Sequence, residues 1–242
     1  MKCLLKPKMV VVVLLTMSYL PSGCAVQDNQ LKHVGRVAIT APGKINLLKR
    51  QYSAAGQSEL QKLKAHDIHN HSVYLKDLGE ATPAVFGFFE TKGDTYDAKI
   101  LPGEKDLHWT DMEDVFYFAG KTDIAVPKSK VQRVGMVIGL RPRMVEAYKL
   151  LHKYSWPEVL QKIYEGNIRN YSIYLHKLKD KYYLFSYFEY VGDDFGADMA
   201  MIDNEPATIA WIKFTDEGCQ LPIPTRTEGE WWAVMEEIFH CD

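Results

Sequence analysis

The residues best suited to chemistry lie on one predicted helix in the C-terminal half of the chain. Tyr148 and His152 are four positions apart, so their side chains share one face of a helix predicted over 144–164. Histidine titrates near neutral pH and can give or take a proton, while tyrosine donates hydrogen bonds to hydroxyl groups. Trp156 is one further step of four along this face, and Pro157 predicts a break in the helix that can open a pocket beside His152. Taken singly, each of these residues fits a packing role better than a catalytic one.

The helix belongs to the second of two similar stretches of sequence. "IHNHSVYLKDL" from Ile68 aligns with "IRNYSIYLHKL" from Ile168, and "GRVAITAP" aligns with "GMVIGLRP" at the same spacing. Later, "WTDMEDVFYF" aligns with "WAVMEEIFHC", so the two stretches begin and end alike. We therefore predict two tandem copies of one unit, over 33–120 and 132–242, joined by a linker over 121–131.

The second copy contains the pattern of a small α+β unit. "RVGMVIGL" predicts a strand, and "NYSIYL" and "YYLFSYFEY" predict a hairpin. A second helix is expected over 198–214, broken at Pro206, and "WWAVMEEIFH" predicts a closing strand. The order βαββαβ is the ferredoxin-like unit, in which helices cover one face of the sheet. The bare face needs a partner, so we expect the two copies to pack sheet to sheet.

At this point the second copy resembles a known family. Its Tyr-x-x-x-His at Tyr148 and His152, its "WPE" at Trp156, its "NYSIYL" with Tyr171 and its closing "MEEIFH" resemble the L-rhamnose mutarotase family. The resemblance implies a dimeric α+β barrel fold, here built within one chain as a pseudo-dimer. It also implies an isomerase that interconverts the α and β anomers of L-rhamnose or a related sugar by acid/base ring opening, without a metal or organic cofactor.

The same resemblance implies roles for individual residues. The residue matching His152 is the family's proton donor, and those matching Tyr148 and Tyr171 hold the sugar with a Trp-Trp pair on the second helix. In this chain the pair is Trp211 followed by Ile212, so one wall of the sugar site is altered. Trp156 is expected to contact the sugar too, because aromatic faces cover the apolar side of a sugar ring.

The first copy has different residues at the matching positions. Leu48, Tyr52 and His71 align with the Tyr, His and Tyr of the second copy, and the second helix is missing. We expect this copy to be catalytically inactive and to replace the second subunit of a dimer. A rival interpretation is a metal site, because His69 and His71 alternate on a predicted strand and His66 is near.

The N-terminus has the features of an export signal. Lysines precede the apolar run "MVVVVLLTMSYL", and "PSGC" resembles a lipobox that ends at Cys24, although Pro21 departs from the usual pattern. We predict a signal over 1–24, lipidation of Cys24, a cell-envelope location and membrane contact only through that anchor. In an oxidising compartment Cys219 and Cys241 could pair, which sequence alone does not establish.

The composition narrows the partners. The net charge is −2 and no basic block occurs, which argues against nucleic acid and leaves a small-molecule sugar as the expected ligand. Two other functions stay open: a sugar-binding lipoprotein module without turnover, and a cofactor-independent oxygenase of the wider α+β barrel group.

Overall fold

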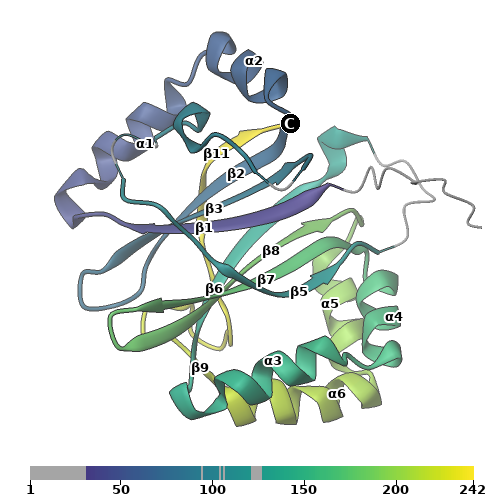
Figure 1. Cartoon of the computed structure of the whole chain (residues 1–242). Coiled ribbons are helices and arrows are strands. Elements are labelled where there is room, and N and C mark those ends of the chain that lie inside the picture. Colours follow the sequence, from purple (N-terminus) through teal and green to yellow (C-terminus); the bar gives the residue numbers. More distant parts are fainter. Residues whose placement is uncertain (1–30, 94, 104, 106, 121–126) are drawn as a thin grey trace, which may run out of the picture.

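Two antiparallel sheets packed face to face form the body of the protein. The computed structural model describes residues 31–242 except 94, 104, 106 and 121–126, so the predicted signal, Cys24 and much of the linker lie outside the described residues. Helices cover the outer face of each sheet (Figure 1). The predicted α+β fold with sheet packed on sheet is confirmed. In the described part of the chain no helix is long and apolar enough to cross a membrane.

The N-terminal half builds a sheet with two helices outside it. Its elements are β1 (Lys32–Ile39), α1 (Ile45–Ser53), α2 (Gln57–Ala65), β2 (Ile68–Asp77), β3 (Pro83–Thr91), β4 (Thr110–Asp111) and β5 (Glu113–Phe118), with 3₁₀ turns at Pro42–Lys44 and Ala98–Ile100. Between β3 and β4 the described chain has that one short turn and otherwise loop, in agreement with the missing second helix.

The C-terminal half has the complete helix set. Its elements are β6 (Gln132–Leu140), α3 (Val145–Lys153), α4 (Pro157–Glu165), β7 (Ile168–Leu178), β8 (Lys181–Tyr190), α5 (Phe195–Asp203), α6 (Pro206–Ile212), a π-helix (Lys213–Glu217), β9 (Gln220–Leu221), β10 (Ala233–Val234) and β11 (Glu236–Cys241), with 3₁₀ turns at Lys128–Lys130 and Pro142–Met144. The helix breaks predicted at Pro157 and Pro206 are confirmed, because each proline begins a new helix, where its missing N–H costs nothing.

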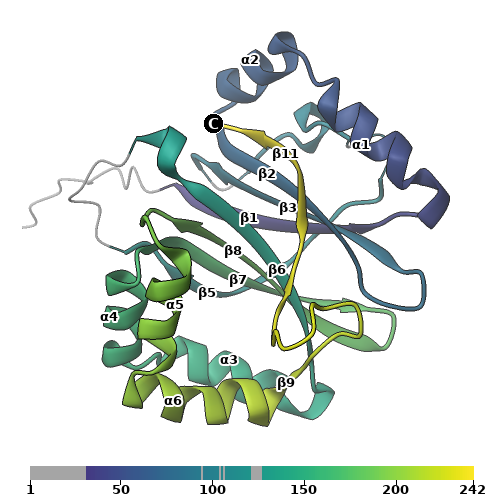
Figure 2. The same cartoon turned by 180° about the vertical axis from the view of Figure 1, so that it is seen from behind.

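The last strand of each half lies in the sheet of the other half. The first sheet has the order β11-β2-β3-β1-β4, and the second has β10-β6-β8-β7-β5. Figure 2 shows β11 running beside β2 in the upper sheet. Ion pairs tie each crossing strand to a helix of its new sheet: Lys149 Nζ lies 2.5 Å from Glu113 Oε1, and Lys49 Nζ lies 2.6 Å from Glu236 Oε2. The sequence comparison predicted the similarity of these strands but not their exchange.

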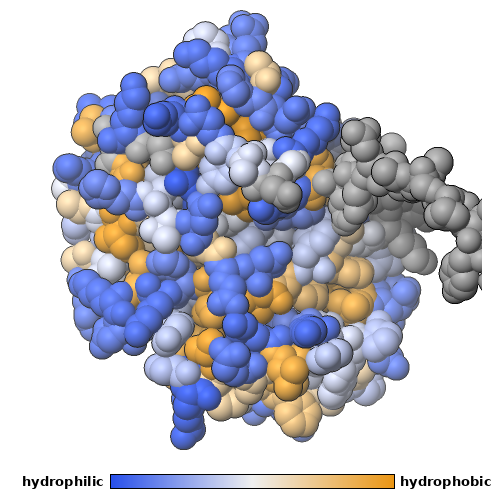
Figure 3. Space-filling model, in the orientation of Figure 1, coloured by the Kyte–Doolittle hydropathy of each residue, from blue (hydrophilic) through white to orange (hydrophobic). Residues whose placement is uncertain are grey.

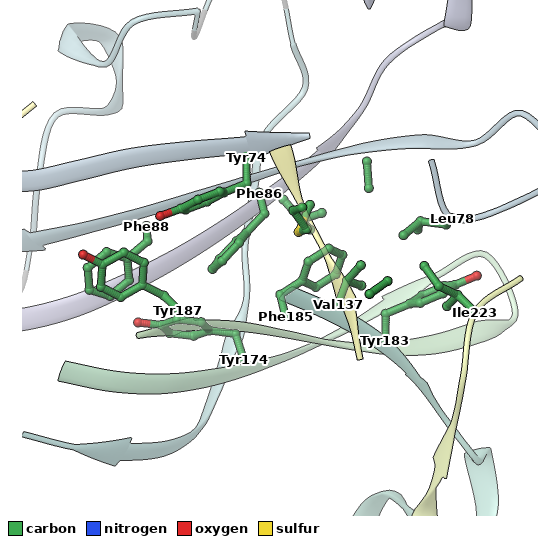
Figure 4. Packing of buried hydrophobic residues seen from close by; sticks show 14 residues of the cluster. Tyr74, Leu78, Phe86, Phe88, Val137, Tyr174, Tyr183, Phe185, Tyr187 and Ile223 are labelled. Carbon is green, nitrogen blue, oxygen red and sulfur yellow. The ribbon is translucent and has the colours of Figure 1, made fainter. Parts of the chain in front are cut away.

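Aromatic rings fill the space between the sheets. Tyr74, Phe86 and Phe88 of one sheet meet Tyr174, Phe185 and Tyr187 of the other (Figure 4), and all six are essentially inaccessible to solvent. The sheets approach closely at two equivalent glycines, because a Cβ at Gly35 would overlap the ring of Tyr174 and one at Gly135 would overlap the ring of Tyr74.

One predicted alternation of side chains is wrong. A bulge between His69 and Ser72, with Asn70 at φ 50°, shifts the register of β2. His69 stays opposite Glu90, whereas His71 is buried on the helix side against Phe89. The histidines therefore face opposite ways, and the described residues contain no group of three His, Cys, Asp or Glu side chains placed to hold a metal ion.

The two cysteines of the folded part do not pair. Cys219 and Cys241 are both free and buried, in separate clusters of the core.

Candidate functional site

The predicted site forms on the helix side of the second sheet, where α3 carries two of its residues. Tyr148 lies on the buried face of α3 and His152 in its last turn. The helix ends at Lys153 with Tyr154 as its C-cap, and the chain then turns at Trp156, whose extended backbone caps α4. The proline that follows Trp156 fixes this corner, so the chain presents His152 and Trp156 on the same side.

His152 is held in one tautomer. Its Nδ1 lies 3.0 Å from the carbonyl oxygen of Tyr148, which can only accept a hydrogen bond. Nδ1 therefore carries the hydrogen, and Nε2 keeps a free lone pair. Burial lowers the pKa of His152 to about 4, against a small opposing effect of this hydrogen bond, so the imidazole is neutral at pH 7. The residue is thus arranged to accept a proton through Nε2.

Tyr148 and Tyr171 are the two tyrosines of the cluster that contains the imidazole. The ring of Tyr148 lies 4.0 Å from that of His152, centroid to centroid, and its hydroxyl accepts a hydrogen bond of 3.4 Å from Gln220. Tyr171 projects from β7 and meets Phe188 edge to face at 5.7 Å. Burial raises the pKa of both tyrosines above the usual value, so both remain neutral hydrogen-bonding groups across the physiological range.

The two predicted tryptophans, Trp156 and Trp211, complete the cluster around His152. Trp211 on α6 is 8% exposed, and its ring lies 5.5 Å from His152 and 5.4 Å from Trp156. Trp156 also meets Phe214 at 6.2 Å. The structure therefore brings all five predicted site residues into one aromatic cluster around the imidazole. The C-terminal half is the lower one in Figure 3, and it carries apolar side chains on its surface, whereas the upper, N-terminal half is mostly hydrophilic.

A carboxylate that sequence reasoning missed lies near the same cluster. Asp216 lies on the π-helix directly after α6, where the wider turn redirects side chains. Its charge is close enough to raise the pKa of both Tyr148 and Tyr171. Burial raises the pKa of Asp216 itself to about 6, although the hydroxyl of Thr215 donates a hydrogen bond of 3.0 Å to it. Nothing in "KFTDEG" distinguishes this acid from a solvent-exposed one.

The N-terminal half supplies a further missed residue. Phe116 of the exchanged strand β5 meets His152 edge to face at 5.6 Å and Tyr171 at 5.4 Å. Its place follows from the strand exchange, which the sequence pattern does not specify.

The equivalent face of the first sheet is filled by its own side chains. Tyr52 donates a hydrogen bond of 3.0 Å to the carbonyl of Pro102, and Leu48 is buried beside it. Trp109 covers this face where Gly87 leaves room, and His71 packs on Phe239 at 5.4 Å. A loop and a tryptophan thus occupy the space that α5 and α6 cover in the other half.

One comparison, with protein-family models, agrees with the resemblance seen in the sequence. Residues 133–241 match the family model described as L-rhamnose mutarotase. No curated protein matches the chain. Among solved structures, a candidate monooxygenase from Lactobacillus acidophilus NCFM has a TM-score of 0.49 at 9% identity, covering 86% of this chain and 95% of that one. One from Fusobacterium nucleatum has a TM-score of 0.47 at 10% identity, covering 87% and 93%.

Proposed function

We propose that the chain, whose residues 133–241 match the family model described as L-rhamnose mutarotase, is a carbohydrate mutarotase that interconverts the anomers of L-rhamnose or a related neutral sugar. The observation that carries the proposal is the free Nε2 of His152, set among the aromatic rings of Tyr148, Tyr171 and Trp211. Such a cluster offers one proton acceptor, hydrogen-bonding hydroxyls and flat apolar surfaces, which are the groups that a sugar hemiacetal requires.

The reaction opens and recloses the sugar ring through two proton transfers. Nε2 of His152 takes the proton of the anomeric hydroxyl while the bond between the anomeric carbon and the ring oxygen breaks. The ring oxygen receives a proton from the carboxyl group of Asp216, whose pKa of about 6 leaves a protonated fraction at neutral pH. After the aldehyde rotates, closure on the other face reverses both transfers. His152 then acts as the proton donor, and both residues return to their starting states.

The altered wall of the site bears on the choice of sugar. In the family a second tryptophan follows the first on this helix, but here Ile212 follows Trp211. Isoleucine lacks the flat ring and the N–H of tryptophan, so a sugar contacts this wall through methyl groups alone. We therefore include L-fucose, D-mannose and D-galactose with L-rhamnose as candidate substrates.

The second candidate function is a sugar-binding module without turnover. Ile212 favours it, because a change in the site wall can remove the geometry of catalysis and still leave affinity. The intact His152, Tyr148 and Tyr171 favour the enzyme.

Exchange NMR of the anomeric protons separates the two functions. We expect residues 25–242 to speed α/β exchange of one sugar above its rate in buffer. His152→Ala should remove about 10²–10⁴ of that acceleration and leave binding. Asp216→Asn should also slow exchange. His66→Gln is the matched control. His66 is exposed and lies in the other half, and its Nδ1 lies 2.8 Å from the carbonyl oxygen of Lys62, four residues earlier, as Nδ1 of His152 lies near that of Tyr148. Exchange at the buffer rate for every sugar, with line broadening of one, would establish the binding module instead.

Two further proposals concern the rest of the chain. The N-terminal half replaces the second subunit of a dimer, since it covers the inner face of the catalytic sheet and supplies Phe116. The segment 1–24 is an export signal whose removal leaves a lipidated Cys24 at the cell envelope. Mass spectrometry of the mature N-terminus tests the second proposal, and an unmodified or uncleaved N-terminus would contradict it.

A further inference from the structure

One buried amide side chain contacts the candidate site from behind and is hydrogen-bonded at both ends. Gln220 lies on β9, opposite Leu140 at the end of β6 (Figure 2), and is only 2% exposed. Its Oε1 accepts a hydrogen bond of 2.8 Å from Nε1 of Trp231, and its Nε2 donates one of 3.4 Å to the hydroxyl oxygen of Tyr148. Burying an amide without partners is costly, so these two bonds are what allows a glutamine at this place.

The indole of Trp231 fixes which end of the amide faces Tyr148. An indole N–H can donate a hydrogen bond but cannot accept one, so the atom beside it must be the amide oxygen of Gln220. The amide nitrogen then faces Tyr148 and donates to its hydroxyl oxygen. The hydroxyl end of the Tyr148 ring is therefore held by a donor of fixed direction.

Tyr148 in turn holds His152 through two contacts. Its ring lies against the imidazole, with centroids 4.0 Å apart and planes at 30°, and its carbonyl oxygen lies 3.0 Å from Nδ1. If the phenol lost its bond to Gln220, the ring could move away from the imidazole on that side. Nε2 of His152 would then lose part of what fixes its direction.

Trp231 belongs to a surface segment between β9 and β10 that is itself tied down. Its side chain is 37% exposed, so the indole reaches Gln220 from the outside. Earlier in the segment, the hydroxyl of Thr225 donates a hydrogen bond to the carbonyl of Asp77 in the N-terminal half. The next residue, Trp232, packs against the core cluster that contains Tyr148. These contacts hold the segment in place at both ends.

The N-terminal half lacks both partners of the bond to the phenol. Leu48 stands at the position of Tyr148, and the stretch of sequence that carries Gln220 in the second copy is missing from the first. Leucine has no hydroxyl for an amide to hold. Donor and acceptor therefore occur together in the half that carries the candidate site and are absent together from the other half.

We propose that Gln220 is a positioning residue for the sugar reaction, acting through Tyr148 to hold His152, and that Trp231 fixes the direction of its amide. This inference rests on the proposed function. In that reaction Nε2 of His152 takes a proton and later returns it, so it must stay aimed at the reacting oxygen of the sugar. Small displacements of a catalytic group slow a reaction by up to about 10²-fold. Gln220 should therefore affect kcat more than KM.

Two substitutions test the proposal in exchange NMR over a range of sugar concentrations. Gln220→Met keeps the length of the side chain and removes both polar ends, and it should lower kcat about three- to tenfold, the value of one hydrogen bond, with little change in KM. Trp231→Phe keeps an aromatic ring and removes only the N–H, so it should lower kcat less. Trp109→Phe is the matched control, because the buried N–H of Trp109 in the other half has no hydrogen-bond partner among the described residues. It should leave kcat unchanged.

A double-mutant cycle separates positioning from a general loss of stability. In a Tyr148→Phe background the acceptor is already gone, so Gln220→Met should have no further effect on kcat. Losses of kcat that simply multiply in the double variant would mean that Gln220 does not act through Tyr148, and the proposal would be wrong.

The imidazole signals of His152 give a readout that needs no turnover. Because the Tyr148 ring lies against the imidazole, Gln220→Met and Trp231→Phe should both shift these signals. They should also raise the pKa of His152 from about 4 toward its ordinary value, as water reaches the ring. Unchanged His152 signals in both variants would overturn the proposal. Shifted signals in a protein that speeds the exchange of no sugar would contradict the proposed function, yet they would support the hold of Gln220 on His152.

Discussion

At the scale of single residues, equivalent positions carry opposite chemistry in the two halves. His71 occupies the position of Tyr171, yet it is fully buried between Phe89 and Phe239, which meet its ring edge to face at 5.8 and 5.4 Å. Burial lowers the pKa of His71 to about 3, assisted by the nearby charges of His240 and Arg36. The imidazole must therefore stay neutral for the half to remain folded.

Because of this depressed pKa, the free energy of unfolding decreases as the pH is lowered. The unfolded chain binds a proton at His71 below about pH 6.5, whereas the folded chain does so only below about pH 3. Lowering the pH between these two values therefore favours unfolding. Between pH 7 and pH 4.5 we expect His71 to cost on the order of 3 kcal/mol of the free energy of unfolding. His71→Phe should remove most of this loss in urea unfolding curves. An exposed control, His66→Phe, should not, and an unchanged pH dependence in His71→Phe would contradict the expectation.

At the scale of elements, the exchanged strands β5 and β11 make each half depend on the other. Phe116 and Phe239 occupy equivalent places on these strands, but Phe116 reaches His152 whereas Phe239 reaches Tyr52 and His71. The same residue type therefore supports a candidate active site on one side and a closed core on the other.

Alanine at these two positions should separate folding from activity. Each substitution removes a phenylalanine from a core and should cost about 3 kcal/mol of the free energy of unfolding. Phe116→Ala should also slow sugar exchange about three- to tenfold, because it removes the edge-to-face contact that positions His152. Phe239→Ala should leave exchange unchanged at temperatures where both variants stay folded. Equal activities of the two folded variants would show that β5 acts as scaffold alone.

The elements also show what the sequence could and could not predict. Hairpins and helix breaks depend on local patterns, so the break before Pro157 and the turn at Lys179 follow from the residues there. The exchange of β5 and β11 depends on which sheet edge is free, and this is a property of the assembled chain. The bulge at Asn70 and the π-helix that carries Asp216 each contain one residue more than a regular strand or α-helical turn. The extra residue changes the direction of the side chains beside it, and the periodicity of the sequence does not show this.

At the scale of the whole molecule, the two halves bury one shared aromatic layer. If residues 127–242 were produced alone, the inner face with Tyr174, Phe185 and Tyr187 would be exposed, β7 would lack its neighbour β5, and β11 would lack a sheet. Both the apolar face and the open strand edges favour association with a second copy.

We therefore expect residues 127–242 to form a symmetric dimer in which each copy donates β11 to the edge of β7 in the other. Light scattering after size exclusion should give twice the mass of the fragment, and its thermal unfolding should depend on concentration. In such a dimer Phe239 takes the place of Phe116 beside His152, so sugar exchange should persist and should fall as dilution dissociates the copies. A stable, folded monomer of the fragment would show that the inner sheet face needs no cover, and the role proposed for the N-terminal half would then be wrong.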